Sequence, residues 1–246
     1  MAGFEHARAL VTGGTRGLGR AVALHLAREG ARVAVTWAHD EAAAGSTLDA
    51  LHAISPESRA ARVSVTDVAA TTALVKELER DWGGVTHLVN NAAIGTSLPL
   101  ALIEEADWDR IFDVNVKGAF FTARAVLAGM IRRRAGAIVN VGSLVGVRMV
   151  EAPVPYCASK AALKGMTEAM AKEVARYGVR VNCVAPGLLE DGIGAQLPDY
   201  RRRDFLQHCA LGRAGRFDEV ARLIAFALSD AASYLNGETL VVDGGV

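Results

Sequence analysis

Short runs of β-branched residues alternate with longer stretches rich in alanine and leucine along the chain of 246 residues. The short runs are apolar throughout rather than at every second position, which is typical of strands buried on both faces of a sheet. Strands separated by helices pair in parallel, with the helices packed over the sheet. The sequence therefore predicts an α/β protein with a doubly wound sheet of about seven parallel strands, flanked by helices on both faces. We expect it to form a single domain over residues 1–246.

The alternation also gives bounds for each expected element. Residues 188–211 break the pattern with glycines, a proline and three consecutive arginines, and we expect an irregular substrate lid there. A solvated surface loop is the alternative. The expected strands are 9–11, 32–36, 61–65, 87–90, 137–141, 180–185 and 239–242. The expected helices are 17–29, 41–53, 69–82, 105–133, 155–177 and 217–228.

The composition argues against several classes of protein. With 27 basic and 27 acidic side chains the formal net charge is zero, which disfavours binding to nucleic acid or to a membrane surface. A hydrophobic fraction of 51% excludes a disordered chain. No apolar run reaches the roughly 18 residues of a membrane span. The three cysteines are scattered, so we expect no disulfide framework, no metal site and a cytoplasmic location.

A glycine-rich turn stands directly between the first expected strand and the first expected helix. It reads Thr12-Gly13-Gly14-Thr15-Arg16-Gly17-Leu18-Gly19. Glycines let the backbone turn tightly and approach a pyrophosphate, whose charge meets the N-terminus of the following helix. Because many loops contain glycines, the position of this turn is the stronger signal. It predicts a Rossmann-type dinucleotide site in which residue 13 and residues 15–19 contact the cofactor.

Further motifs follow the later strands in a fixed order. They are Asn90-Asn91-Ala92-Ala93 after the fourth strand, Asn115 in a Val-Asn-Val-Lys stretch, Ser143 after the fifth strand, Tyr156-Cys157-Ala158-Ser159-Lys160, Pro186-Gly187 after the sixth strand, and Asn236-Gly237 with Asp243-Gly244-Gly245. Together with the glycine turn, they resemble the motifs of the short-chain dehydrogenase/reductases over essentially the whole chain. Within that family the chain looks most like the 3-oxoacyl-acyl-carrier-protein reductases, including the stand-alone ketoreductases of polyketide pathways.

The resemblance implies four catalytic residues. Tyr156 would be the acid/base, with Lys160 as its partner and as a ribose contact. Ser143 would bind the carbonyl oxygen, and Asn115 would hold a water that relays protons to Lys160. Ketone reduction needs such a proton donor beside the hydride donor. Tyrosine titrates near 10, and Lys160 one helical turn later, together with the helix N-terminus just before Tyr156, predicts a lowered pKa. Each of the four residues alone would be an ordinary residue of a helix face, a helix cap or a loop. Their occurrence together, in this order along the chain, favours a catalytic role.

The choice of cofactor follows from charge at the end of the second strand. Trp37 stands where an NAD enzyme usually carries a carboxylate, and Arg16 can pair with a 2′-phosphate, so we expect NADPH rather than NADH. We interpret Asp40 and Glu41 as the first turn of the next helix. Asp67 is also a candidate helix N-cap. By the resemblance, the remaining cofactor contacts are Asp67, Val68, Asn91, Ala92, Ala93, Tyr156, Lys160, Pro186, Gly187 and Leu189.

Two positions depart from the family pattern. Ala93 replaces a glycine, and its methyl group fits if the local φ is negative. Asp191 stands where the family often has a threonine that touches the nicotinamide amide. The contacts of the lid, and with them the substrate group, stay open at this point.

The expected function is NADPH-dependent reduction of a 3-oxoacyl thioester, bound to acyl carrier protein, in fatty-acid or polyketide biosynthesis. Arg134 and Lys172 resemble the positions where such reductases bear charges for the acidic carrier beside the mouth of the site. Solvated charges at helix ends are the alternative. The resemblance also implies a homotetramer that pairs residues 105–133 and 155–177 across one interface. Two other functions stay open: oxidoreduction of a free alcohol or ketone, and a non-catalytic dinucleotide sensor.

Overall fold

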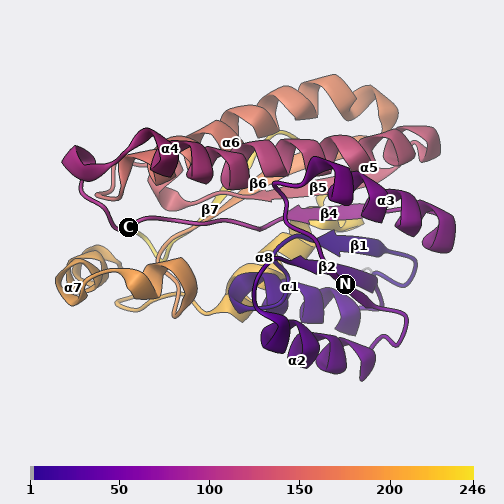
Figure 1. Cartoon of the computed structure of the whole chain (residues 1–246), viewed down its shortest axis with the longest axis horizontal. Helices are drawn as coiled ribbons and strands as arrows, with labels where there is room; N and C mark the ends of the chain where they lie inside the picture. Colours follow the sequence, from indigo (N-terminus) through magenta and orange to yellow (C-terminus); the bar gives the residue numbers. More distant parts are fainter. Residues whose placement is uncertain (1–2) are drawn as a thin grey trace.

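Seven parallel strands form one sheet in the order β3-β2-β1-β4-β5-β6-β7 (Figure 1). The computed structural model describes residues 3–246, with the backbone alone described at residues 195–196. The predicted fold class is confirmed; the single domain over 1–246 stays a prediction, and its first two residues lie outside the described part. The strands are β1 (Arg8–Val11), β2 (Arg32–Trp37), β3 (Arg59–Arg62), β4 (His87–Asn90), β5 (Gly136–Val141), β6 (Val179–Pro186) and β7 (Thr239–Val242).

The strand order changes direction between β1 and β4. The chain first adds β2 and β3 on one side of β1 and then continues from β4 to β7 on the other. Ligands of such sheets bind at this point, beyond the carboxyl ends of the strands. The turns that follow β1, β4, β5 and β6 all leave the sheet at that edge, and they contain the motifs singled out in the sequence.

Helices cover both faces of the sheet (Figure 1). Helices α1 and α8 pack with one apolar core through residues such as Val22, Leu26 and Ile224. Helices α3, α5 and α6 pack on the opposite face, where Leu78 and Val126 belong to a second core. The helices are α1 (Gly17–Arg28), α2 (Glu41–His52), α3 (Val68–Trp82), α4 (Glu105–Phe112), α5 (Ala119–Arg133), α6 (Val154–Val174), α7 (Asp199–His208) and α8 (Phe217–Leu228). Shorter turns lie at Leu100–Leu102, Asp113–Gly118, Leu144–Gly146, Ala175–Tyr177, Gly192–Gln196 and Asp230–Ala232.

Two expected elements differ from the structure. The third strand spans Arg59–Arg62 rather than 61–65, because this edge strand is positioned by pairing with β2 and not by its own apolar residues. Val65 instead packs against the helix backbone at Gly118. The expected irregular lid contains helix α7, which begins after Pro198. That helix buries no side chain fully, so it has no apolar periodicity that the sequence could reveal.

The stretch Glu105–Arg133 is long and apolar enough, by length and composition alone, to cross a membrane. Of its most apolar window, 44% is buried inside the protein. Ala123, Val126 and Met130 from this stretch belong to the core between the helices and the sheet. Because a buried core helix passes the same test, the stretch is only weak evidence for a membrane span.

The central strand β4 makes folding sensitive to acid through His87. Burial, and secondarily the charge of Arg180, lowers the pKa of His87 to about 4. The unfolded chain takes up this proton near pH 6.5, so the stability contributed by the neutral ring is complete above that pH and is lost between pH 6.5 and about 4. The difference corresponds to roughly 3 kcal/mol.

We therefore expect urea unfolding to show a loss of that size between pH 6.5 and 4 that a His87→Phe variant does not share. The variant keeps an aromatic ring beside Phe4, whose ring meets His87 edge-on at 5.4 Å. Equal acid sensitivity in both proteins would assign the transition to other groups.

Candidate active site

The glycine turn lies where β1 passes into α1, at the change of strand order. Gly13 has φ +60°, and a Cβ there would lie 3.0 Å from the Ala92 Cα. A Cβ at Gly19 would collide with the Gly13 carbonyl oxygen. Both positions therefore require glycine, because the space that a side chain would take is filled by the residues after β4 and by the turn itself. Helix α1 begins at Gly17, so its free N–H groups face the same turn. This cradle fits the pyrophosphate of a dinucleotide.

Hydrogen bonds with the residues that follow β4 hold the glycine turn in place. The Asn91 side chain donates to the carbonyl oxygens of Thr12 and Gly13, both at 3.0 Å. In return, the Thr12 hydroxyl accepts from the backbone N–H groups of Asn91 and Ala92. Among the described residues other than glycine, only Arg134 has a positive φ, so Ala93 meets the condition on which its methyl group is tolerated. Thr12 was missed as an organising residue, because the turn was interpreted through its glycines and its partners, Asn91 and Ala92, are distant in the sequence.

At the adenosine end, two carboxylates are helix caps. The Asp40 side chain accepts from Ala43 N–H and begins α2, as expected from the sequence. Asp67 accepts from Ala70 N–H and begins α3. The capping interpretation of Asp67 is thus correct, and its expected contact with adenine stays a prediction, together with that of Val68.

Arg62 is a cationic residue at this end of the sheet that the sequence did not indicate. The parallel register sets Trp37 opposite Arg62, and the Arg62 guanidinium lies 5.3 Å from the centroid of the Trp37 ring. Exposed Arg16, the N-cap residue of α1, lies in the neighbouring glycine turn. The end of β2 therefore has the guanidinium groups of Arg16 and Arg62 nearby, and β2 itself carries no carboxylate there. The position of Arg62 depends on how the edge strand β3 pairs with β2, and this pairing cannot be obtained from one sequence.

Tyr156 and Lys160 lie in the first two turns of α6, on one face of the helix. Lys160 is 3% exposed, and its ammonium group donates to the Val141 carbonyl oxygen at 2.8 Å. The same ammonium lies 5.7 Å from the centroid of the Tyr156 ring. Since Val141 is the last residue of β5, the hydrogen bond fixes the lysine at the carboxyl edge of the sheet.

The expected lowering of the Tyr156 pKa is wrong for this structure. Burial raises the pKa of Tyr156 to about 12, although a hydrogen bond with the Ser143 side chain partly opposes this. Burial also lowers the pKa of Lys160 to about 8. The physical reason is desolvation, which disfavours the charged form of both groups. The phenol is therefore protonated at neutral pH, ready to donate rather than accept.

Asn115 lies in a wider helical turn between α4 and α5. The turn spans Asp113–Gly118 and has π-helical geometry, which is frequent at functional sites. The Asn115 side chain pairs with both backbone groups of Ile94 and donates to the Ser159 hydroxyl at 3.0 Å. Ser159 in turn donates to the Tyr156 carbonyl oxygen. Asn115 thus connects the loop after β4 with the helix of Tyr156; its expected water is a prediction.

Ser143 follows β5 and precedes the short turn Leu144–Gly146. The lid reaches the opposite side of Tyr156: a Cβ at Gly95 would lie 3.2 Å from Ile193 and 3.8 Å from the Tyr156 ring. Asp191 accepts from Gly192 N–H at 2.7 Å and begins the turn that carries Ile193. The residue that departs from the family pattern therefore caps the turn of the lid that comes near the Tyr156 ring.

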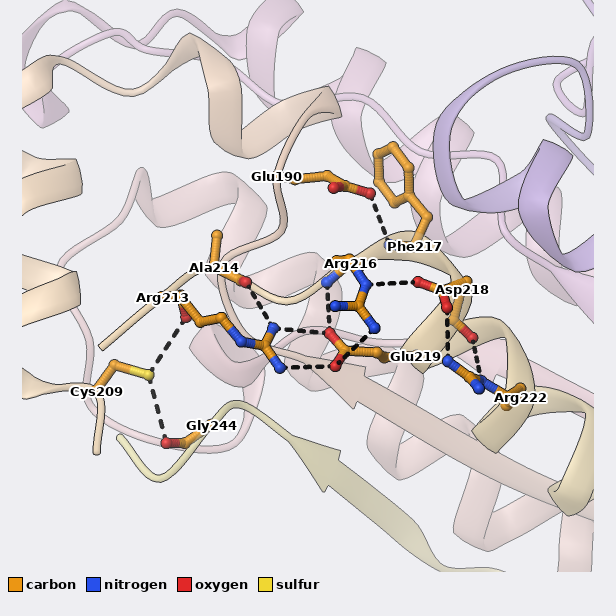
Figure 2. A network of polar contacts seen from close by, with 10 residues as sticks. All are labelled: Glu190, Cys209, Arg213, Ala214, Arg216, Phe217, Asp218, Glu219, Arg222 and Gly244. Atoms are coloured by element: carbon orange, nitrogen blue, oxygen red, sulfur yellow. Dashed lines mark hydrogen bonds and ion pairs between the residues drawn. The ribbon is translucent and has the colours of Figure 1, made fainter. Parts of the chain in front are cut away.

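The base of the lid is tied to α8. Glu190 N–H donates to the Gly215 carbonyl oxygen, and the Glu190 carboxylate accepts from Phe217 N–H at 3.0 Å, at the start of that helix (Figure 2). Pro186 and Gly187 end β6 on the same side, and Leu189 bridges to Gly215. The expected cofactor loop at 186–189 is thus a fixed segment from which the lid departs.

Arg134 and Lys172 do not lie beside this mouth within one chain. Arg134 ends α5 in a left-handed conformation immediately before β5, at the amino edge of the sheet, and its side chain donates to the Arg176 carbonyl oxygen. Lys172 lies in the last turn of α6, about 24 Å along the helix axis from Tyr156. Within one chain, these two residues therefore lie away from the mouth, and their expected contact with a carrier protein stays a prediction. Helix α6 is simply too long to bring both its ends to one edge.

The site as a whole joins a dinucleotide cradle to a protonated phenol, an ammonium group and a hydroxyl. A doubly wound sheet with such a site belongs to the Rossmann-type dinucleotide-binding proteins. Among the residues that the structure describes, no group of three or more histidine, cysteine, aspartate or glutamate side chains is arranged to hold a metal ion.

Known proteins resemble the chain over almost its full length. A family model described as enoyl-(acyl carrier protein) reductase matches residues 13–246. The 3-oxoacyl-(acyl-carrier-protein) reductase FabG of Staphylococcus aureus is 37% identical, covering 97% of both chains. FabG of Escherichia coli is 38% identical over 99% of this chain and 98% of its own. A short-chain dehydrogenase from Burkholderia cenocepacia, solved in complex with NADP, superimposes with a TM-score of 0.90 at 32% identity, covering 98% of both chains. The chain belongs to the short-chain dehydrogenase/reductase family.

Proposed function

We propose that the protein is an NADPH-dependent ketoreductase that converts a 3-oxoacyl thioester, held on an acyl carrier protein, into the 3-hydroxyacyl thioester. The observation that carries the proposal is the arrangement of Tyr156, Lys160 and Ser143 around one point beside the glycine cradle. Relatives of matching length are named for this reaction. A cytoplasmic location fits a chain whose three cysteines are free thiols.

The proposed chemistry divides between cofactor and protein. NADPH, when bound, supplies the hydride that reaches the carbonyl carbon. The Ser143 hydroxyl holds the carbonyl oxygen next to the phenol, and Tyr156 gives its proton to that oxygen. Because the raised pKa keeps Tyr156 protonated at neutral pH, it is in the state that reduction requires. The Lys160 ammonium then stabilises the phenolate until a proton returns, through a water that we assign to Asn115.

The preference for NADPH rests on charge at the adenosine end. Arg16 in the glycine turn and Arg62 above Trp37 can both reach a 2′-phosphate, and the neighbouring carboxylate of Asp40 is occupied as a helix cap. A structural relative was solved with NADP. Charge-assisted bonds from a guanidinium to a phosphate are strong and geometrically specific.

Replacing Arg16 by alanine should therefore weaken NADPH binding by roughly 10- to 100-fold and change NADH binding little. Fluorescence titration with both cofactors measures the two affinities. Arg28→Ala, an exposed arginine at the far end of the same helix, is the matched control. Equal losses for NADPH and NADH would mean that the phosphate is held elsewhere, for which Arg62 is the next candidate.

Carrier binding requires a second copy of the chain if Arg134 and Lys172 are its contacts. In a two-fold pairing of α6 with its equivalent, the helices run antiparallel, so the last turn of one lies beside the first turn of the other. Lys172 would then stand near the Tyr156 of the neighbouring copy. The expected homotetramer, paired through the 105–133 and 155–177 helices, would provide this arrangement. The acidic carrier would dock across the pair.

The proposed function is tested by one substrate panel. Consumption of NADPH is followed with 3-oxoacyl groups on carrier protein, on a short pantetheine mimic and as free ketones, and with 2-enoyl thioesters because of the enoyl reductase model. We expect turnover of the 3-oxoacyl thioesters, and a loss confined to the carrier-bound substrate in Arg134→Glu and Lys172→Glu. Faster turnover of free ketones would favour small-molecule oxidoreduction. NADPH binding without consumption of any substrate would favour the sensor.

A further inference from the structure

Residues 243–246, which follow β7 and are called the tail below, contact the segments that surround the candidate active site. A Cβ at Gly187 would lie 2.9 Å from the Asp243 Cα, and Gly187 N–H donates to the Val242 carbonyl oxygen. On the other side, Leu211 N–H donates to the Gly244 carbonyl oxygen at 3.0 Å. The tail thus lies between the cofactor loop and the end of the lid.

A buried thiol strengthens the attachment to the lid. Cys209, the first residue after α7, is 4% exposed, and its sulfur lies 3.4 Å from the Gly244 carbonyl oxygen (Figure 2). It also lies 3.6 Å from the carbonyl oxygens of Arg213 and Asp243. The tail therefore has a single defined position relative to both the lid and the carboxyl end of β6.

The third contact of the tail is with the loop that carries Ser143. The Arg148 guanidinium lies 3.2 Å from the Asp243 carboxylate and also donates to the Val246 carbonyl oxygen. The Asp243 side chain is only 10% exposed, and its other oxygen accepts from Gly245 N–H. Arg148, whose side chain is 50% exposed, is the cation that pairs with this nearly buried carboxylate; the contact is an ion pair, and among the described residues the Asp243 Oδ2 atom accepts no hydrogen bond.

Arg148 is rigidly connected to Ser143. The intervening turn is closed by Gly146 N–H donating to the Ser143 carbonyl oxygen and by Arg148 N–H donating to the Leu144 carbonyl oxygen. A Cβ at Gly146 would lie 2.6 Å from the Lys160 carbonyl carbon, so the turn sits directly on the α6 backbone. A shift at Arg148 therefore moves Ser143 relative to Tyr156.

We propose that Arg148 and Asp243 are a pair of positioning residues, which hold the Ser143 hydroxyl in register with Tyr156 and with the cofactor loop at Gly187. The proposal rests on the proposed function only in that the reaction uses Ser143 to hold a carbonyl oxygen. Neither residue touches the phenol, and each acts through the turn that joins it to Ser143. Displacement of a reacting group by about 1 Å costs as much as 100-fold in rate, so the effect on turnover is large enough to measure.

The test compares Arg148→Met, Asp243→Asn and the double variant with wild type. Arg32→Ala is the control, since it removes an exposed ion pair with Glu57 at the opposite edge of the sheet. We expect each single variant to lower kcat roughly 10-fold, with unchanged NADPH affinity and an increased isotope effect from deuterated NADPH. The double variant should be no slower than the slower single variant, because the two residues act as a unit. Arg148→Lys should recover part of kcat.

A second readout does not depend on turnover. Hydrogen exchange of the amides at 146–148 should become faster in both single variants and remain unchanged in Arg32→Ala. The proposed pairing of Arg148 and Asp243 would be overturned by any of three results. These are unchanged kcat and hydrogen exchange in the single variants, additive losses of kcat in the double variant, and an NADPH affinity that falls in proportion to kcat. If the wild type reduces no 3-oxoacyl thioester, the proposed function fails. The role of Arg148 and Asp243 is then tested separately, by the hydrogen-exchange data and by the turnover of any ketone in the panel that the wild type reduces.

Discussion

Replacing Tyr156 by phenylalanine should lower kcat roughly 100-fold or more while leaving NADPH affinity nearly unchanged. The reason is that the phenol is the group expected to give its proton to the carbonyl oxygen, and its pKa of about 12 keeps the proton on it throughout the neutral range. The ring remains in place in the variant, so the cofactor surface is preserved. Steady-state kinetics and a fluorescence titration with NADPH measure the two quantities.

Ser143→Ala is the companion variant for this prediction. It removes the hydroxyl that bonds Tyr156 and keeps the proton donor, so we expect a smaller loss of kcat than in Tyr156→Phe. Near-normal turnover in Tyr156→Phe would remove the phenol from the mechanism.

Replacing Lys160 by methionine should abolish turnover and yet make the protein more stable at neutral pH. Burial lowers the pKa of this lysine to about 8 from 10.5, so keeping the ammonium charged costs the folded state roughly 3 kcal/mol below pH 8. Methionine fills the same space without that cost and loses one charged hydrogen bond, to the Val141 carbonyl oxygen, that is worth about 1.5 to 3 kcal/mol. The net gain is then at most about 2 kcal/mol, which would raise the thermal midpoint by up to several degrees.

The pH dependence identifies the source of this stability. The advantage of Lys160→Met should be greatest at pH 7 and should shrink as pH rises from about 8 toward 10.5, where the lysine is neutral in both the folded and the unfolded chain. Thermal unfolding of the two proteins at pH 7 and at pH 9.5 gives the comparison. A destabilised variant at pH 7 would mean that the ammonium is better solvated than its burial implies.

The sequence predicted the parts of the fold that depend on local pattern. Strands β1, β2, β4, β5, β6 and β7 were expected within a residue or so of their bounds, because a continuous apolar run reflects burial on both faces. The edge strand β3 was misplaced, since only its partner defines it. Helix α7 was missed, because an exposed helix without a buried face has no periodic signal.

The candidate site was predictable as a list of residues but not as a set of interactions. The order of motifs pointed to Tyr156, Lys160, Ser143 and Asn115, which lie near one another in the structure, and their catalytic roles stay predictions. What the sequence could not give was desolvation, which reverses the expected direction of the Tyr156 pKa. Contacts that join distant segments were equally hidden, such as that of Arg62 with Trp37.

The hydrogen bonds from Asn91 to Thr12 and Gly13 have a consequence for how the protein folds during its synthesis. The two partners of this contact are separated by 79 residues of chain, so a growing polypeptide carries the glycine turn long before its anchor has been synthesised. During that interval the loop has only its bonds to Thr36 and Thr47 and lacks the two that Asn91 provides. We expect cofactor to act on a nascent chain only after β4 has been added, when the first and fourth strands meet.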